Sequence, residues 1–200
     1  MNLSLKFDKG TLLVFGAEKH QLQFLNELSW DERTNSFRAP AAEYRNIVTD
    51  LRKNKISYKD NARKFSALSF PLKKIITPRS FQTEAAEAWI SEKRGVVALP
   101  TGSGKTILAV MLIARIGRPT LVHVPTIDLM GQWNAVLSEY FDIKIGLLGG
   151  GVNDIQLITV ATYDSALLHV PYRGNQFGLL VFDECHHLPG EQFKFTAIGF

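Results

Sequence analysis

The 200-residue sequence has a single cysteine, Cys185, and no long uninterrupted apolar segment. One cysteine excludes an internal disulfide and any zinc cluster built on several thiolates. The longest apolar run, residues 107–114, is far shorter than the roughly 20 residues that a membrane-spanning helix needs. The N-terminus also has no signal-peptide pattern. We therefore expect a soluble intracellular protein with no membrane partner.

The sequence has enough apolar residues, 46%, for one large domain or two small ones with packed cores. Its charge is divided unevenly along the chain. Residues 1–78 contain 14 lysines and arginines against 8 acidic residues, whereas residues 79–200 contain 9 against 11. This asymmetry favours a polyanionic partner for the first part of the chain. A solvated basic surface without a partner is an equally good interpretation.

Residues 1–75 are predicted to form a small α+β domain. Alternating apolar residues at 3–7 and 11–15 flank Asp8-Lys9-Gly10 and predict a hairpin, and residues 28–30 and 37–39 predict a second one. After Pro40, the helical spacing of four apolar residues predicts a helix that packs on these strands: Tyr44, Ile47, Val48 and Leu51. A dense basic stretch follows, comprising Arg52, Lys53, Lys55, Lys59, Arg63, Lys64, Lys73 and Lys74.

Residues 76–200 alternate between strand and helix patterns, which is typical of an α/β domain with a parallel sheet covered on both faces. Strands are expected at residues 96–99, 121–124, 143–148, 155–162 and 179–183. Helices are expected around Phe81, Ala85, Ala88 and Trp89, over residues 105–116 with Gly117 as the cap, and around Leu129, Trp133, Val136 and Tyr140. Because the pattern reaches Phe200 with no closing signal, we expect this domain to continue beyond it.

The strongest chemical signal is a glycine-rich turn between the strand expected at 96–99 and the following helix. Its glycines allow successive N–H groups to form a concave nest, to which the helix N-terminus adds its dipole. Such a nest suits the phosphates of ATP, with Lys105 at the β- and γ-phosphates and the Thr106 hydroxyl on Mg²⁺. The predicted ATP-binding residues are Thr101, Gly102, Ser103, Gly104, Lys105 and Thr106. The usual P-loop pattern has glycine where this sequence has Leu99.

A second signal is an acidic pair directly after the strand expected at 179–183. Ligands of parallel sheets bind at the carboxyl ends of the strands. There Asp183 is a candidate Mg²⁺ ligand, and Glu184 is a candidate base for the water that attacks the γ-phosphate. Lys105, Asp183 and Glu184 are thus the candidate catalytic residues. His186 and His187 are an alternative metal pair, but adjacent histidines project in different directions and no further ligands cluster nearby.

The segment from Leu99 to Thr106, together with Asp183-Glu184-Cys185-His186-His187, resembles superfamily-two helicases of the DExH class. Within that class it is most similar to the XPB family of DNA repair and transcription helicases, and above all to the archaeal members. The resemblance implies a RecA-like P-loop domain, the incomplete first motor domain of an ATP-dependent DNA helicase, preceded by a damage-recognition domain at residues 1–75. It also implies that the protein is located in a prokaryotic cytoplasm. The implied partners are DNA and proteins of repair or transcription.

The resemblance assigns further roles to individual residues. Arg79 and Gln82 match a segment that contacts ATP, in which the glutamine binds the adenine edge, and His186 and His187 match residues that couple hydrolysis to movement. Contact with the DNA backbone is implied for Pro125, Thr126, Gly149, Gly150 and Thr162, with Arg52, Lys53 and Lys55 as basic contacts in the first domain. Arginine fingers belong to the family's second motor domain, so residues 1–200 alone are expected to turn over ATP poorly.

Two other functions fit the same motifs. One is the motor subunit of a restriction system, although residues 1–78 lack the Glu-x-Lys and Asp-x-Lys patterns of a metal-dependent nuclease. The other is a nucleotide-gated module that clamps DNA without turnover. Several residues have a purely structural interpretation: Trp89, Trp133 and His123 fit packed core positions, and Cys185 fits a small buried thiol.

Overall fold

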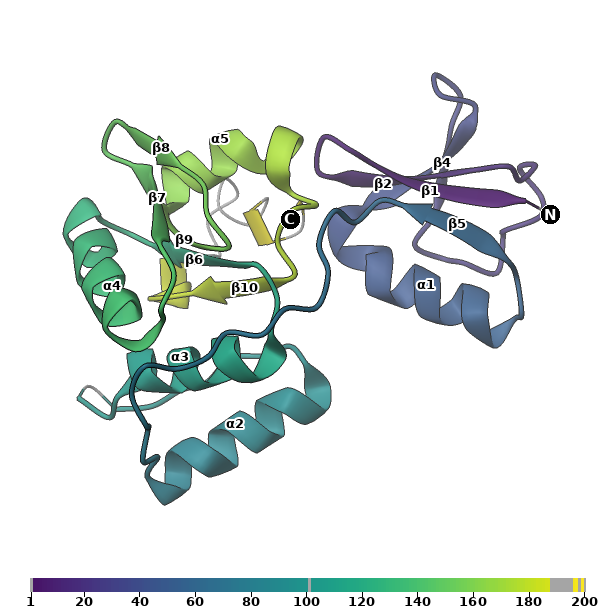
Figure 1. The fold of residues 1–200 in the computed structure, drawn as a ribbon. Helices are drawn as coiled ribbons and strands as arrows, with labels where there is room; N and C mark the ends of the chain where they lie inside the picture. The colour runs from purple at the N-terminus through teal and green to yellow at the C-terminus, as the bar shows by residue number, and fades with distance from the viewer. Residues whose placement is uncertain (1, 101, 188–195, 198, 200) are drawn as a thin grey trace.

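The chain forms two lobes, each built on its own five-stranded sheet (Figure 1). The computed structural model describes residues 2–100, 102–187, 196, 197 and 199. The first sheet has the strand order β3-β4-β2-β1-β5. Its elements are β1 (Leu3–Asp8), β2 (Thr11–Phe15), β3 (Ser29–Asp31), β4 (Ser36–Pro40), the short 3₁₀ helix η1 (Ala41–Glu43), α1 (Tyr44–Lys53) and β5 (Tyr58–Asn61).

The two hairpins predicted in this lobe are confirmed. Strand β1 pairs with β2 in antiparallel register, and the turn residues Lys9 and Gly10 have φ values of 49° and 79°. Two consecutive positive φ angles define the turn whose twist matches that of a hairpin. Strands β3 and β4 are also antiparallel, with Asn35 at φ 47° in the turn. The predicted helix is confirmed as α1, which buries Ile47, Val48 and Leu51 against the sheet.

The segment that follows β5 is a packed strap along the second lobe (Figure 1). The Asn175 side-chain amide donates to the Ala62 carbonyl at 2.6 Å, and the Leu68 N–H donates to the Gly117 carbonyl at 2.7 Å. Phe70 is 5% exposed and packs edge-to-face on Phe141, with ring centroids 6.1 Å apart. The strap therefore contributes a core side chain to the second lobe.

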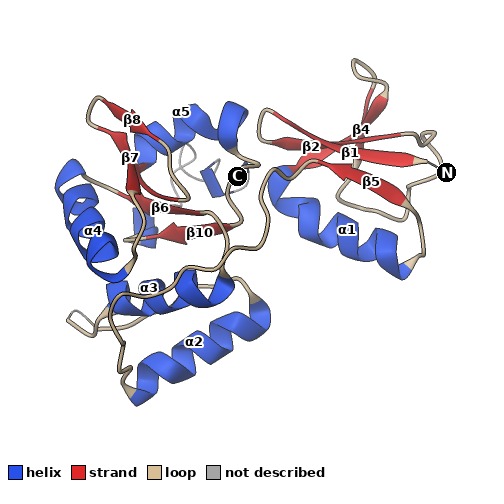
Figure 2. Ribbon diagram, viewed as in Figure 1, coloured by secondary structure: helices blue, strands red, loops and turns tan. Residues whose placement is uncertain are grey.

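The second lobe contains a sheet with helices on both faces, as predicted (Figure 2). Its strand order is β10-β6-β9-β7-β8, and all neighbouring strands are parallel except β7 and β8. The strands are β6 (Thr120–Val124), β7 (Ile145–Gly149), β8 (Val152–Asp154), β9 (Ile158–Thr162) and β10 (Leu179–Phe182). The helices are α2 (Ser80–Glu92), α3 (Lys105–Ile116), α4 (Ile127–Tyr140) and α5 (Tyr163–Arg173), and the 3₁₀ helix η2 covers Cys185–His187.

The two faces of this sheet have separate cores. On one face, Val110 of α3 and Trp133 of α4 pack against Val122 and Val160, and on the other face Ala166 of α5 packs against Leu121. Helix α2 lies outside α3, with Ala86 against Leu108 and Leu112. Among the described residues, no helix combines the length and the apolar character needed to cross a bilayer.

The strand predicted at residues 96–99 is wrong. Helix α2 ends at Glu92, its cap Lys93 lies in the left-handed region at φ 58°, and Gly95 follows at φ 136°, so the chain changes direction there. Val97 and Leu99 then pack against α2 and α3, whereas Val96 is 77% exposed. The apolar run is partly covered by helices and does not pair as a strand. Within the described part of the chain, β10 is consequently the edge strand of the sheet.

Candidate functional site

The glycine-rich turn forms a loop whose backbone only glycine adopts easily. Gly102 and Gly104 have φ values of 74° and 83°, in the left-handed region. The Ser103 N–H donates to the Pro100 carbonyl at 3.2 Å, and Gly104 caps the start of α3. Thr101, also predicted to bind ATP, lies outside the described residues. The N-terminus of the twelve-residue helix α3 therefore faces the space enclosed by this loop, where a phosphate group is predicted to bind.

Hydrogen bonds from the Gln82 side chain connect this loop to the start of α2. Its side chain is buried, with Nε2 donating to the Ser103 carbonyl at 3.0 Å and to the Gly104 carbonyl at 3.2 Å. Its Oε1 accepts the Arg79 N–H at 2.9 Å. The φ of 83° at Gly104 favours glycine, and an added Cβ atom there would also lie 2.7 Å from Nε2. Both ends of the Gln82 amide are thus engaged within the protein, while the Arg79 guanidinium lies 6.0 Å from the Phe81 ring.

Three side chains of the loop differ in their surroundings. The Lys105 ammonium is exposed and donates to the Leu99 carbonyl at 3.1 Å. Thr106 is half-buried in the first turn of α3. The Ser103 hydroxyl is buried and has no hydrogen-bond partner among the described residues. Because a buried hydroxyl without a partner is unfavourable, the Ser103 position is a sign of an incomplete polar site.

The acidic pair lies at the carboxyl end of the sheet, as predicted. The Asp183 N–H donates to the His123 carbonyl at 2.9 Å, which continues the pairing of β10 with β6. The Trp133 indole N–H donates to Asp183 Oδ2 at 2.7 Å, and the Tyr163 hydroxyl donates to the Asp183 carbonyl at 2.9 Å. Glu184 is exposed, with φ at 51°, and its N–H donates to Asp183 Oδ1 at 3.1 Å.

The aromatic residues beneath this pair are buried and uncharged. His123 is completely buried and stacks on Phe182, with ring centroids 4.2 Å apart. Burial lowers the pKa of His123 to about 3, so the imidazole is neutral at ordinary pH. Burial also raises the pKa of Tyr163 above its usual value, with smaller contributions from Cys185 and Asp183, so its hydroxyl keeps its proton. The prediction that His123 is a packed core residue is confirmed.

His186 lies beside the acidic pair, with Nδ1 3.3 Å from Glu184 Oε2. His187 completes η2, but its side chain lies outside the described part of the structure. Within the described residues, no group of three or more potential metal ligands comes together. The alternative of a histidine-based metal centre therefore has no support from the described side chains.

One cleft, with a volume of about 380 Å³, brings the two chemical motifs together. Lys105 lines it from α3, and Asp183, Glu184 and His186 line it from the end of β10. Residues 95–99, Trp89 and Trp133 form much of the remaining wall. The other described residues predicted to bind ATP or Mg²⁺ form no part of this wall: Arg79, Gln82, Gly102, Ser103, Gly104 and Thr106.

The residues predicted to contact DNA in the second lobe gather where α4 and α5 begin. Thr126, directly after Pro125, accepts the Leu129 N–H at 3.2 Å and caps α4. Thr162 accepts the Ser165 N–H at 3.3 Å and caps α5. A Cβ atom on Gly149 would lie 3.0 Å from the Thr162 side chain, and one on Gly150 would lie 3.1 Å from Ile127. We call this region, with Pro125, Thr126, Gly149, Gly150 and Thr162, the helix-start edge.

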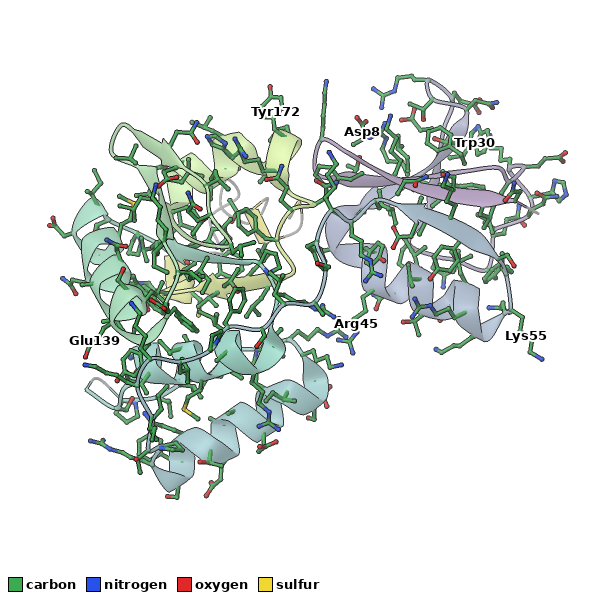
Figure 3. All side chains as sticks on the ribbon, viewed as in Figure 1. Asp8, Trp30, Arg45, Lys55, Glu139 and Tyr172 are labelled. Atoms are coloured by element: carbon green, nitrogen blue, oxygen red, sulfur yellow. The ribbon has the colours of Figure 1, made fainter. Side chains whose placement is uncertain are left out.

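The basic residues of the first lobe lie elsewhere. Figure 3 shows Lys55 at the end of α1 that is remote from the second lobe, whereas Arg45 extends toward it. Arg45 donates to the Glu92 carbonyl at 2.9 Å. Lys53 forms an ion pair with Asp50, and Arg52 donates to the Tyr58 hydroxyl at 2.9 Å. Arg52, Lys53 and Lys55 therefore form a region separate from the helix-start edge.

Sequence reasoning missed the contacts of Trp133 and Tyr163 with Asp183. Trp133 was expected to be a core residue, and it is indeed only 5% exposed. Its indole N–H nevertheless bonds to a carboxylate 50 positions away in the sequence. Local apolar spacing carries no information about such a partner. The one available signal was that Trp133 follows Pro125 and Thr126, to which the family resemblance assigns contact with DNA.

A parallel sheet with a glycine-rich turn before a helix, and with an acidic pair at its carboxyl edge, defines a RecA-like P-loop domain. The UvsW helicase from bacteriophage T4 has a related fold: its crystal structure aligns with 100% of this chain and 88% of that chain, with a TM-score of 0.54 and 17% identity. At that identity, the similarity supports the fold alone.

Sequence comparison identifies the family. The profile described as "Xeroderma pigmentosum group B helicase damage recognition domain" matches residues 5–62, and "Type III restriction enzyme, res subunit" matches residues 75–198. The DNA 3'-5' translocase XPB2 of Sulfurisphaera tokodaii is 41% identical over 171 residues, which are 85% of this chain and 38% of that protein. The DNA 3'-5' helicase XPB of Mycobacterium tuberculosis is 32% identical over 130 residues, 60% of this chain and 24% of that protein. The chain belongs to the XPB-type helicases.

Proposed function

We propose that this chain is the ATP-binding half of an ATP-dependent DNA translocase of the XPB type, which acts in nucleotide excision repair or transcription. The observation that carries the proposal is the single cleft lined by Lys105, Asp183 and Glu184. A P-loop lysine and an acidic pair facing one space are the parts that nucleotide hydrolysis requires. The chain spans 38% of the S. tokodaii relative, so the activity is proposed for the full-length protein.

The residues fit ATP with Mg²⁺. The buried Ser103 hydroxyl lacks a partner among the described residues, and two left-handed glycines turn the loop toward the N-terminus of α3. These features suit phosphate oxygens. Thr106 and Asp183 supply the hydroxyl and carboxylate oxygens that Mg²⁺ prefers. When bound, Mg²⁺ would neutralise negative charge on the β- and γ-phosphates.

The chain's own residues have distinct roles in this proposal. Lys105 exchanges the Leu99 carbonyl for phosphate oxygens, since its ammonium group is exposed and its present partner is neutral. Glu184 accepts the proton of the attacking water. His186 lies 3.3 Å from the Glu184 carboxylate and, with His187, couples this step to movement. Gln82 holds the glycine-rich loop to the start of α2 through its bonds to Ser103 and Gly104, and Arg79 beside it supports ATP binding.

DNA is proposed to bind along the helix-start edge. The N-termini of α4 and α5 carry the positive ends of their helix dipoles, which suits phosphate oxygens, and the glycines allow close approach of a backbone. Residues 1–75 are proposed to recognise damaged DNA, with Arg52, Lys53 and Lys55 among its phosphate contacts. Such a protein works in a prokaryotic, archaeal cytoplasm, alongside repair or transcription proteins.

The test is steady-state ATP hydrolysis by the full-length protein with and without duplex DNA. We expect DNA to stimulate hydrolysis, because helix starts that bind DNA belong to the same domain as the cleft. The described cleft is lined by Lys105 and no arginine, so an arginine must be supplied from elsewhere for fast turnover. Nucleotide-dependent DNA binding without turnover would instead support a clamp that does not hydrolyse ATP.

A further inference from the structure

Asp183 is held by two aromatic side chains that come from opposite faces of the sheet. Trp133 belongs to α4, which packs on the same face as α3, and Tyr163 is the first residue of α5 on the other face. Trp133 bonds to the Asp183 carboxylate, while Tyr163 bonds to the Asp183 main-chain carbonyl. The side chain and the main chain of Asp183 are therefore held by hydrogen bonds from two different helices.

These contacts fix the carboxylate in orientation. Oδ2 accepts the Trp133 indole N–H at 2.7 Å, and Oδ1 accepts the Glu184 N–H at 3.1 Å. Trp133 is 5% exposed among core residues, so its donor has little freedom to move. An indole N–H is a donor only, and each carboxylate oxygen has a further lone pair. The arrangement therefore restricts the rotation of the carboxylate and leaves lone pairs for a metal or its waters.

Both supporting helices start at the helix-start edge. Tyr163 directly follows the cap Thr162, and Trp133 lies about two turns after the cap Thr126. Gly149 lies against Thr162 and also close to Met130 of α4. Because a helix moves nearly as a rigid body, a ligand that shifts either helix start changes the position of a donor to Asp183.

We propose that Trp133 and Tyr163 are positioning residues for the Asp183 carboxylate, and that they transmit DNA binding at the helix-start edge to the metal-binding site. The inference rests on the proposed function, because it assumes that this edge binds DNA and that Asp183 binds Mg²⁺. Partners that orient a metal ligand typically change metal affinity or activity 10- to 100-fold, roughly, when they are replaced. Trp133 has this relationship to the Asp183 carboxylate, whereas Tyr163 holds the same residue through its main-chain carbonyl.

The first experiment measures metal affinity in the full-length protein. Mn²⁺ replaces Mg²⁺, ADP is present, and free Mn²⁺ is followed by electron paramagnetic resonance. Trp133→Phe keeps an aromatic ring but loses the indole N–H, and should weaken Mn²⁺ binding by about 10-fold. The matched control is Tyr140→Phe on the same helix, since the Tyr140 hydroxyl makes no hydrogen bond to the described residues. The control should bind Mn²⁺ like the unaltered chain.

Trp133→Phe also removes volume from the core, so a second variant is needed to separate the loss of the hydrogen bond from the loss of packing. Replacing Trp133 with 3-benzothienylalanine keeps the shape of the bicyclic ring and substitutes sulfur for the N–H group. It should reproduce the weakened Mn²⁺ binding while the thermal unfolding midpoint stays near that of the unaltered chain. Unchanged Mn²⁺ affinity in this folded variant would overturn the positioning role of Trp133.

The second experiment measures DNA stimulation of ATP hydrolysis in the full-length protein. Tyr163→Phe should lower the ratio of DNA-stimulated to basal turnover several-fold, with Tyr140→Phe as control. If the unaltered protein neither hydrolyses ATP nor responds to DNA, the proposed function itself fails. If the unaltered protein responds and Tyr163→Phe responds equally, only the transmission through Tyr163 is refuted.

Discussion

Lys105 donates a hydrogen bond to the carbonyl of Leu99, 3.1 Å away, so the P-loop lysine is held by the segment that leads into its own loop. Residues 95–99 also form a wall of the cleft that Lys105 shares with the acidic pair. Nucleotide binding must therefore release Lys105 from Leu99. Since phosphate is charged and the carbonyl is neutral, the exchange favours the bound state.

Binding and hydrolysis should separate in two variants of the full-length protein. Lys105→Ala removes the cation that faces the phosphates, so both ATP affinity and turnover should fall. Glu184→Gln keeps the shape of the side chain but loses the proton acceptor, so ATP should still bind while turnover falls by roughly 100-fold or more. Fluorescent-nucleotide binding and phosphate release measure the two effects. A Glu184→Gln variant with normal turnover would remove Glu184 from the role of base.

Gln82→Ala should weaken the binding of ATP and GTP to a similar degree. The substitution leaves the Ser103 and Gly104 carbonyls and the Arg79 N–H without their partner, at a cost of about 1–3 kcal/mol for buried groups. Competition binding measures both nucleotides. The control is Thr83→Ala, an exposed neighbour whose contact with the Arg79 carbonyl is long, at 3.5 Å. A loss confined to adenine nucleotides would instead show that Gln82 binds the base directly.

DNA binding by the first lobe and the strap should depend on a subset of the basic residues between positions 52 and 74. Lys53, Arg63, Lys73 and Lys74 form ion pairs with acidic residues of the chain. Within the described structure, Arg52, Lys55, Lys59 and Lys64 form none. If these four neutralise phosphates, the log–log slope of affinity against salt is about −3.6, or roughly 150-fold between 50 and 200 mM.

Fluorescence anisotropy at several salt concentrations tests this division. Replacing Lys55 and Lys59 by alanine should reduce the slope by about 1.8, whereas Lys73→Ala should leave it nearly unchanged. Because phosphate contacts do not distinguish sequence, base order should have little effect, while mismatched duplex should bind better where distortion is easier. If Lys73→Ala reduced the salt slope as much as the Lys55 and Lys59 double substitution does, unpaired basic residues would not be the ones that contact DNA.

His123 should make the stability of the second lobe sensitive to mild acid. Its folded pKa is about 3, below the ordinary value of 6.5, because the ring is buried. Below pH 6.5 the unfolded chain therefore binds a proton that the folded chain does not, and the free energy of unfolding falls as the pH is lowered from 7 to 5. The slope is on the order of 1 kcal/mol per pH unit. Urea unfolding should show a flatter profile for His123→Asn, but not for the exposed control His20→Asn.

Local chemistry explains what the sequence predicted correctly in the fold. The turn at Lys9-Gly10 and the spacing of Ile47, Val48 and Leu51 determine a hairpin and a helix without distant partners. Strand β5 was missed because its residues are polar and its pairing with β1 spans most of the lobe. Helix α5 was missed although Tyr163, Ala166 and Val170 fall at helical spacing, because Pro171 lies inside it.

In the candidate site, too, the sequence predicted the local motifs and missed the contacts between distant segments. Lys105, Asp183 and Glu184 belong to compact motifs, and the structure brings them to one cleft. The strand expected at 96–99 failed because a short apolar run does not reveal whether strands or helices will bury it. The bonds of Gln82 to Ser103 and Gly104 and the bond of Trp133 to Asp183 span 21 or more positions, and no local pattern encodes them.

Phe70 packs in the core of the second lobe although it precedes the first helix of that lobe by ten positions. Deleting a buried phenylalanine side chain typically costs about 3–5 kcal/mol, a large share of a domain's stability. A gene fusion that transferred only the segment after residue 75 would remove Phe70 from this core and destabilise the second lobe by that amount. Recombination that moves the second lobe between proteins must therefore carry residues 63–75 with it, whereas Ala62 packs in the core of the first lobe and must stay with that lobe.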